Sequence, residues 1–239
     1  MKWGIRVLLF CSICFFNSLS FFYIEGCNCR YNLAICAVFR DDAPYLKEWI
    51  EFHRMLGVDH FYLYNNLSTD NFIEVLEPYV KEEVVDVIDW PYTFLFQDHD
   101  QWIKVQTKAY NDALAKYRDT CRWIAFIDTD EFLLPFHEDN LVNLLSNYEK
   151  FGGLCVSWLL FGTSHVDHLS PDDLLIEKLT FCGPSNYHSF HKSIVNPQHV
   201  DHFEQVHTPI YAPPYFGVNS GGIPVAENSF FSEDKKDII

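Results

Sequence analysis

Positive charge is scarce in this sequence of 239 residues, which has 17 Lys and Arg against 33 Asp and Glu and a formal net charge of −16. A protein that follows a nucleic-acid backbone needs clustered basic residues, so the composition argues against such a partner and favours cations as ligands. The cysteines that follow the N-terminal segment contain no Cys-x-x-Cys pair, so a structural zinc site of that type is not expected. Internal repeats are also absent.

Apolar residues, by contrast, are abundant. The sequence is 49% hydrophobic and 17% aromatic. This composition supplies a well-filled core, and the length suits one large domain or two small ones. We therefore expect a globular protein.

The N-terminus carries a targeting segment. Lys2 and Arg6 precede an apolar stretch, residues 7–24, that is interrupted only by Ser and Asn. At about 18 residues this stretch is at the lower limit for crossing a bilayer, and small residues near its end also suit signal cleavage. We assign residues 1–29 to a single-pass membrane anchor that leaves the basic residues in the cytoplasm and the domain across the membrane. A cleaved signal and a secreted chain are the alternative.

Apolar runs and helical spacings alternate after this segment. The expected order is strand 32–40, helix 43–57, strand 58–66, helix 69–80, strand 83–90, helix 100–118 and strand 122–128. Such alternation predicts an α/β fold with a mostly parallel, Rossmann-like sheet flanked by helices, in which ligands bind beyond the carboxyl ends of the strands.

The second half of the chain has a different character. A helix is expected over 140–152, and strands over 153–164, 173–181 and 190–197 of a smaller mixed portion. Residues 216–239 are Gly-rich, then charged and without periodicity, so we expect a tail.

Polar residues follow each of the first four expected strands. Arg40, Asn65, Asp89 and Asp128 stand at these strand ends. Because the carboxyl ends of parallel strands meet at one edge, these residues are expected to border one crevice. Polar residues are also common in ordinary loops, which is the alternative for each of them.

The most informative stretch places Asp128, Asp130 and Glu131 directly after an apolar run. Side chains two positions apart on a strand share a face, so Asp128 and Asp130 are expected to approach one another. Two neighbouring carboxylates repel unless a cation offsets them, and Mn²⁺ or Mg²⁺ prefers such oxygen ligands. This arrangement suggests group transfer from a nucleotide-activated donor. The alternative is that Asp130 caps a turn and Glu131 is solvated.

Four ordered motifs resemble glycosyltransferase family 92. They are YLYNNLSTDN, WIAFIDTDEFL, VSWLLFGTS followed by LIEKLTF, and HKSIVNPQHV with VHTP, and together they span 33–209. The resemblance implies an A-type glycosyltransferase fold over residues 30–215, with the mixed portion on the acceptor side. It also implies a nucleotide-sugar donor such as UDP-galactose, a glycan acceptor, a divalent metal ion and an inverting transfer of a hexose.

The resemblance assigns a role to individual residues. The expected metal ligands are Asp128, Asp130 and His207, with Asp130 as the direct carboxylate ligand. The expected donor site contains Arg40, Asn65, Asp89, Gln106, Asp128 and Lys192, with Lys192 facing the diphosphate. The expected catalytic base is Glu177, or else Asp172 or Asp173, and the expected acceptor platform is Trp158 and Phe161. Packing or solvation is the alternative for each, and a zinc site of His199, His202 and His207 competes for the last histidine.

Two features depart from the expected pattern. The residues after 209 lack the His-Tyr segment and the basic helix of the family. Asn66-Leu67-Ser68 fits an N-glycosylation site but lies inside the expected donor crevice, so we interpret it as coincidental. A metal-dependent phosphohydrolase and a non-catalytic, degenerate transferase that binds carbohydrate are the alternative functions. For a eukaryotic transferase with this anchor, a Golgi-like membrane is the expected location.

Overall fold

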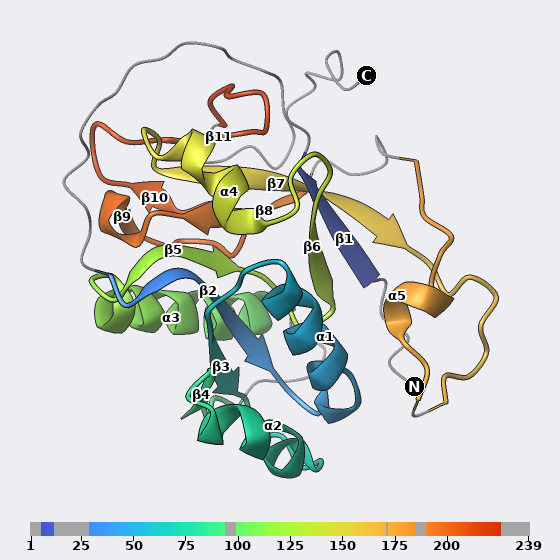
Figure 1. Ribbon diagram of the computed structural model, residues 1–239. Coiled ribbons are helices and arrows are strands. Elements are labelled where there is room, and N and C mark those ends of the chain that lie inside the picture. Colours follow the sequence, from blue (N-terminus) through green and yellow to red (C-terminus); the bar gives the residue numbers. More distant parts are fainter. Residues whose placement is uncertain (1–5, 12–28, 94–98, 171, 185–189, 226–239) are drawn as a thin grey trace.

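The structure, a computed structural model, describes residues 6–11, 29–93, 99–170, 172–184 and 190–225, with the backbone alone for 6–11 and 99 (Figure 1). The strands are β1 (Arg6–Cys11), β2 (Tyr31–Phe39), β3 (His60–Asn65), β4 (Val85–Asp89), β5 (Cys121–Phe126), β6 (Glu131–Pro135), β7 (Gly153–Phe161), β8 (His191–Val195), β9 (Val200–His202), β10 (Ile210–Tyr211) and β11 (Gly217–Val218). The helices are α1 (Ala43–Met55), α2 (Phe72–Lys81), α3 (His99–Tyr117), α4 (Leu141–Leu145) and α5 (Leu175–Lys178), with short 3-10 turns at Ser146–Tyr148 and Pro197–His199.

One large sheet organises the molecule. Its strand order is β4-β3-β2-β5-β8-β7-β1-β6, and β11 pairs with β7. The strands β4, β3, β2 and β5 are mutually parallel, whereas β8 runs antiparallel to both β5 and β7. The predicted α/β class with a mostly parallel sheet is confirmed.

Both faces of the parallel part are covered, which explains why β2 is continuously apolar and buried from Leu33 to Phe39. One face of β2 (Leu33, Ile35) packs with α1 and α2, and the other face (Ala34, Cys36) packs with α3. Figure 1 shows α1 and α3 on opposite sides of this sheet. The carboxyl ends of the strands therefore remain as the place where polar groups can gather.

The first half of the chain follows the predicted order, with each expected strand and helix between residues 31 and 126 present. Gly57 closes α1 as predicted, with a φ of 92° that glycine adopts without strain. The helix expected over 140–152 is shorter and continues as a 3-10 turn. The strand expected over 173–181 is wrong, because this segment contains helix α5. Strand β6 begins at Glu131, where no strand was predicted.

Both ends of the described chain contribute strands. In the expected anchor, Arg6–Cys11 forms β1, whereas residues 1–5 and 12–28 lie outside the described part, so the anchor stays a prediction. In the expected tail, Gly217–Val218 forms β11 beside β7, and residues 226–239 lie outside. Of the helices in the described residues, none combines the length and apolar character needed to cross a bilayer.

Candidate functional site

The carboxyl ends of the parallel strands lie side by side. In the ladders, Phe39 is the register partner of Asn65, and Asn65 is the partner of Asp89. On the other side of β2, Phe126 of β5 is level with Cys36. The polar residues that follow these strands therefore meet at one edge of the sheet, as the alternating pattern predicts.

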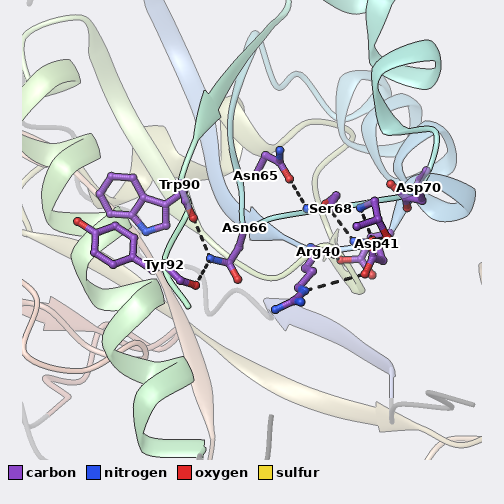
Figure 2. Close-up of polar contacts among 11 residues, drawn as sticks. Arg40, Asp41, Asn65, Asn66, Ser68, Asp70, Trp90 and Tyr92 are labelled. Atoms are coloured by element: carbon purple, nitrogen blue, oxygen red, sulfur yellow. Dashed lines mark hydrogen bonds and ion pairs between the residues drawn. The ribbon is translucent and has the colours of Figure 1, made fainter. Parts of the chain in front are cut away.

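Two loops at this edge are tied together by side chains (Figure 2). Asp41 has a φ of 55°, in the left-handed region that costs energy for a residue other than glycine. Its backbone N–H donates to Ser68 Oγ at 3.0 Å, and its Oδ1 accepts the backbone N–H of Thr69 at 2.6 Å. Ala43 N–H donates to Asp70 Oδ2 at 2.8 Å. The hydrogen bond from Thr69 lowers the pKa of Asp41. These bonds hold a strained loop in one shape.

Three expected donor residues lie along this edge. Arg40 donates its backbone N–H to Asp42 Oδ2 at 3.2 Å, and its Nε lies 3.9 Å from Asp41 Oδ2. Asn65 accepts a backbone hydrogen bond through Oδ1 at 3.0 Å. Asp89 is exposed at the end of β4. All three are in the region where the sequence places a nucleotide.

Asn66, the acceptor of the N-glycosylation pattern, is 0% exposed. Its Nδ2 donates to the backbone oxygens of Trp90 at 2.8 Å and Tyr92 at 2.9 Å (Figure 2). In the folded protein, a side-chain amide that is buried and already donates twice has no room for a glycan. This geometry agrees with the interpretation that the pattern is coincidental.

Asp128, which follows β5, is held at both carboxylate oxygens. Gln106 Nε2 of α3 donates to Oδ1 at 2.6 Å, and Lys192 Nζ of β8 donates to Oδ2 at 3.0 Å. The backbone N–H of Asp128 donates to Glu131 Oε2 at 2.9 Å. These contacts explain how acidic residues are accommodated beside an apolar stretch, since both the partly exposed Asp128 and the buried Glu131 accept hydrogen bonds.

Lys192 and Glu131 are each 1% exposed, and Lys192 Nζ lies 3.8 Å from Glu131 Oε2. Burial raises the pKa of Glu131 well above its ordinary value, and the charge of Lys192 works against this effect. Burial disfavours the charged form of Lys192, but the carboxylates of Asp128 and Glu131 outweigh it and raise its pKa. Lys192 is therefore a protonated ammonium group inside the protein.

The middle residue of the acidic motif turns away from its neighbours. Thr129 is 6% exposed and donates its hydroxyl to Asp42 Oδ2 at 3.0 Å. Asp128 and Asp130, on either side of it, are partly exposed. The two acids are thus presented at the edge of the sheet, while Thr129 ties the turn to the loop after β2.

His207 lies before β10 and is neutral. Its Nδ1 is 2.9 Å from the carbonyl oxygen of His191, so Nδ1 carries the proton and Nε2 the lone pair. Burial, reinforced by the charge of Lys192, lowers the pKa of His207 to about 4. The ring lies 5.3 Å from that of Trp158. An imidazole in this state is suited to bind a metal ion or accept a hydrogen bond.

The loop that carries His207 is fixed by further hydrogen bonds. His191 Nε2 is 2.6 Å from Thr208 Oγ1, and Ser193 Oγ donates to the carbonyl of His207 at 2.7 Å. The backbone N–H of His207 donates to Gln205 Oε1 at 2.9 Å. Strand β8 therefore positions this histidine as well as Lys192.

The two expected acceptor residues have different surroundings. Trp158 is half-buried, its ring is 5.2 Å from that of Phe190, and Lys192 Nζ lies 6.0 Å from the ring centre. Its Nε1 is buried and meets no hydrogen-bond partner within the described chain. Phe161, at the end of β7, forms a bridge with Cys182. Only Trp158 of this pair adjoins the Asp128 network in the described residues.

The expected metal ligands offer suitable donors. Asp130 has a carboxylate and the tautomer of His207 places the ring lone pair on Nε2, whereas both carboxylate oxygens of Asp128 already accept hydrogen bonds from the protein. Over the ranges that the structure describes, no group of three or more His, Cys, Asp or Glu could hold a metal by itself. Mg²⁺-type cations are usually bound by one or two carboxylates plus substrate phosphates instead of an all-protein cage. The residues thus fit a cation that binds together with a diphosphate.

The competing zinc site finds no common centre. His199 Nδ1 is 3.3 Å from the carbonyl oxygen of Phe151, and His202 Nδ1 is 2.9 Å from Asp201 Oδ2. Each of these histidines therefore has a partner different from that of His207. The described histidines do not form a shared ligand set.

The expected catalytic bases lie on or beside α5. Glu177 and Asp172 are exposed, and no hydrogen bond or ion pair between described residues joins them to Asp128. The carboxylate of Glu48 accepts the backbone N–H groups of Leu175 at 2.8 Å and Ile176 at 3.0 Å. This contact fixes the start of α5 against α1. The role of Glu177 or Asp172 stays a prediction.

Some contributors to the site were missed from the sequence. The role of Glu131 as a buried partner of Lys192 was not predicted, nor was the bond between Thr129 and Asp42. One indication was available: Glu131 directly precedes the apolar residues 132–134, and Lys192 lies within the expected strand 190–197. Two such charges favour a buried pair, because an unpaired buried charge is costly.

Comparison with known proteins gives consistent results. The family model described as Glycosyltransferase family 92 matches residues 31–231. "Glycosyltransferase family 92 protein At1g27200" of Arabidopsis thaliana is 31% identical over 147 residues, which are 58% of this chain and 23% of that protein. "Galactan beta-1,4-galactosyltransferase GALS2" of the same plant is 30% identical over 111 residues, 44% of this chain and 20% of that protein. This chain thus spans about a quarter or less of these relatives.

Among solved structures, "Crystal structure of S. aureus TarS 1-349 in complex with UDP" has a TM-score of 0.38 and 12% sequence identity to this chain. The superposition covers 52% of this chain and 34% of TarS.

Proposed function

The chain belongs to glycosyltransferase family 92, and we propose that it transfers a hexose from a nucleotide-sugar donor to a glycan acceptor at the sheet edge around Asp128. The observation that carries this proposal is the fixed Asp128 carboxylate, which Gln106 and Lys192 hold beside the ends of four parallel strands. In open α/β sheets this edge is where nucleotides bind.

The donor proposal divides the edge into two parts. The nucleoside is expected near Arg40, Asn65 and Asp89, which follow adjacent strands. The diphosphate is expected at Asp128 and Asp130. The interlocked loops around Asp41 support this assignment, because a binding edge that is already rigid loses little freedom when a ligand binds.

Asp130 and His207 would hold a Mn²⁺ or Mg²⁺ ion together with the diphosphate. When bound, such an ion neutralises negative charge on a departing diphosphate. Asp128 would orient the turn that presents Asp130, since both of its carboxylate oxygens already accept protein hydrogen bonds.

The proposed reaction inverts the configuration of the sugar. A bond forms between the acceptor oxygen and the anomeric carbon as the bond from this carbon to the diphosphate breaks, and a carboxylate takes the acceptor proton. Glu177 is the proposed base and Asp172 its alternative. Trp158 and Phe161 are the proposed acceptor platform, and the half-buried ring of Trp158 beside His207 supports the former.

The donor sugar is proposed to be galactose, carried by UDP. Support comes from the relative that is named a galactan beta-1,4-galactosyltransferase. The membrane anchor over residues 1–29 also remains a proposal, supported by the apolar stretch after Lys2 and Arg6. Resistance of the full chain to extraction from membranes by alkaline carbonate tests it, and complete release would contradict it.

The nucleotide proposal is tested by the thermal stability of the full chain with a panel of nucleotide sugars. Measurements are made with Mn²⁺, with Mg²⁺ and after chelation. We expect UDP-hexoses to raise the unfolding temperature only when a divalent cation is present, because cation and diphosphate bind together. Asp130→Asn and His207→Gln are expected to abolish the cation-dependent increase.

Three outcomes would contradict parts of this proposal. A shift with UDP-galactose that survives chelation would remove the metal ion from the site. No shift with any nucleotide would remove the donor, and binding of a glycan alone would then favour the non-catalytic alternative. Release of phosphate from a nucleotide sugar without transfer would favour the phosphohydrolase.

A further inference from the structure

Lys192 is enclosed within the acidic motif. The residue is 1% exposed, and its Nζ lies 3.0 Å from Asp128 Oδ2 and 3.8 Å from Glu131 Oε2. The ring centre of Trp158 is 6.0 Å away, within the range of a cation–π contact. The ammonium group therefore faces groups of the protein, and its charge is compensated before any ligand arrives.

The two carboxylates beside Lys192 are also connected to each other. Glu131 Oε2, which lies near Lys192, accepts the backbone N–H of Asp128 at 2.9 Å. Lys192 thus acts on Asp128 at two points, directly through Oδ2 and indirectly through the backbone. Gln106 holds the remaining oxygen, Oδ1. Removal of Lys192 would leave the buried Glu131 and the partly exposed Asp128 without their counter-ion, and the loss is severe for Glu131 because its carboxyl is enclosed by protein.

We propose that Lys192 is a positioning residue: it is the fixed counter-ion of Asp128 and Glu131 and shapes the diphosphate site through them, without contact to the diphosphate. This inference rests on the proposed function, because the turn that Lys192 holds is the proposed diphosphate site. It replaces the expectation from the sequence that Lys192 faces the diphosphate.

A charge-matched double variant distinguishes a counter-ion of Asp128 and Glu131 from a residue that contacts the diphosphate. Asp128, Glu131 and Lys192 together carry a formal charge of minus one. Lys192→Met keeps an unbranched side chain but leaves two uncompensated acids. The double variant Lys192→Met with Glu131→Gln again leaves a single acid, so it restores the formal charge. Lys47→Met on the exposed face of α1 is the control for the loss of one lysine.

Two readouts are needed on the full chain: the dissociation constant of UDP in the presence of Mn²⁺, measured by calorimetry, and the unfolding midpoint in urea. We expect Lys192→Met to weaken UDP binding at least tenfold and to lower the midpoint. The double variant is expected to regain affinity to within about threefold of the wild type, and most of the midpoint. Lys47→Met is expected to match the wild type in both.

The possible results distinguish this inference from the proposed function. If the double variant regains stability but binds UDP as weakly as Lys192→Met, Lys192 contacts the diphosphate and the inference is overturned. If Lys192→Met loses stability but keeps its affinity for UDP, Lys192 only stabilises the fold, and the inference is overturned. If the wild type does not bind UDP, the proposed function fails, and the inference is overturned with it even where the unfolding midpoints still identify Lys192 as the counter-ion.

Discussion

The hydroxyl of Thr129 donates to Oδ2 of Asp42 at 3.0 Å and joins the turn after β5 to the loop after β2. The same oxygen of Asp42 accepts the backbone N–H of Arg40 at 3.2 Å. Two strand ends therefore share one carboxylate. The residue between the two acids of the motif is a link between the proposed nucleoside and diphosphate regions.

Thr129→Val tests this link, since it keeps the shape of the side chain and removes the donor. We expect the free energy of unfolding to fall by about 1.5–3 kcal/mol, the range for a hydrogen bond to a charged group. Urea unfolding measures it. Thr129→Ser keeps the hydroxyl and should lose less. Equal stabilities of wild type and Thr129→Val would show that the bond contributes nothing.

Gln106→Glu tests the clamp on Asp128. The change replaces the Nε2 donor, 2.6 Å from Asp128 Oδ1, with an oxygen that repels it. Partners that orient a metal-binding group typically change metal affinity by about 10–100-fold, so we expect UDP binding with Mn²⁺ to weaken by at least about tenfold. Gln198→Glu makes the same change at an exposed position and should bind normally. Unaltered affinity of Gln106→Glu would separate this glutamine from the donor site.

Glu177→Gln tests the proposed base. General base catalysis typically contributes about 10²–10⁴-fold, so kcat for galactosyl transfer should fall by at least about 100-fold. The affinity for UDP should not change, because this residue acts on the acceptor. Glu74→Gln, on the exposed face of α2, is the control. If Asp172→Asn loses the activity and Glu177→Gln keeps it, the role belongs to Asp172.

The stability of the fold should depend on pH through His53, which joins α1 to β6. Its Nδ1 is 2.8 Å from the carbonyl of Trp49, and its Nε2 accepts the backbone N–H of Leu133 at 3.1 Å. Burial lowers the pKa of His53 from 6.5 to about 4. The unfolded chain therefore takes up the proton first as the pH falls. The stabilisation is complete above about pH 6.5 and is lost progressively toward pH 4.

The size of this effect follows from the pKa difference. At about 1.4 kcal/mol per unit, a drop from 6.5 to about 4 corresponds to roughly 3 kcal/mol. Urea unfolding between pH 7 and pH 4 measures it, with His53→Gln as the non-titrating comparison. His207, whose pKa is also about 4, contributes in the same window, so the informative quantity is the difference between the two slopes. Parallel slopes would contradict the prediction.

The parts of the fold that were predicted depend on local patterns. The apolar runs of β2 to β5 and the helical spacings between them predict the succession of strands and helices along the chain, and the edge of the sheet where polar residues meet. The segment around α5 was predicted wrongly because its helix depends on a distant group: Glu48 of α1 caps the N–H groups of Leu175 and Ile176. No local pattern contains that contact.

In the candidate site, too, some residues were predicted from local patterns and others depend on distant contacts. The sequence identified Asp128, Gln106 and Lys192, and the structure brings these three together. It did not predict that Glu131 is buried beside Lys192, and this pairing also explains why β6 was missed. A charged glutamate is not expected within a buried strand, but Glu131 begins β6 because Lys192 of β8 compensates its charge. Such pairs depend on the packing of strands that are distant in sequence.

The buried Asn66 leads to a prediction about modification. The pattern Asn66-Leu67-Ser68 satisfies the sequence requirement for N-glycosylation, but Asn66 is 0% exposed and donates to the carbonyls of Trp90 and Tyr92. A glycan on Nδ2 would remove these hydrogen bonds and could not be accommodated in the core. We therefore expect folded protein, secreted from a eukaryotic host, to carry an unmodified Asn66 in peptide mass spectrometry. Ser68→Ala, which removes the pattern, should give the same electrophoretic mobility before and after deglycosylation as the wild type. A glycosylated Asn66 in the folded fraction would mean that the β3–α2 loop opens far more than its hydrogen bonds indicate.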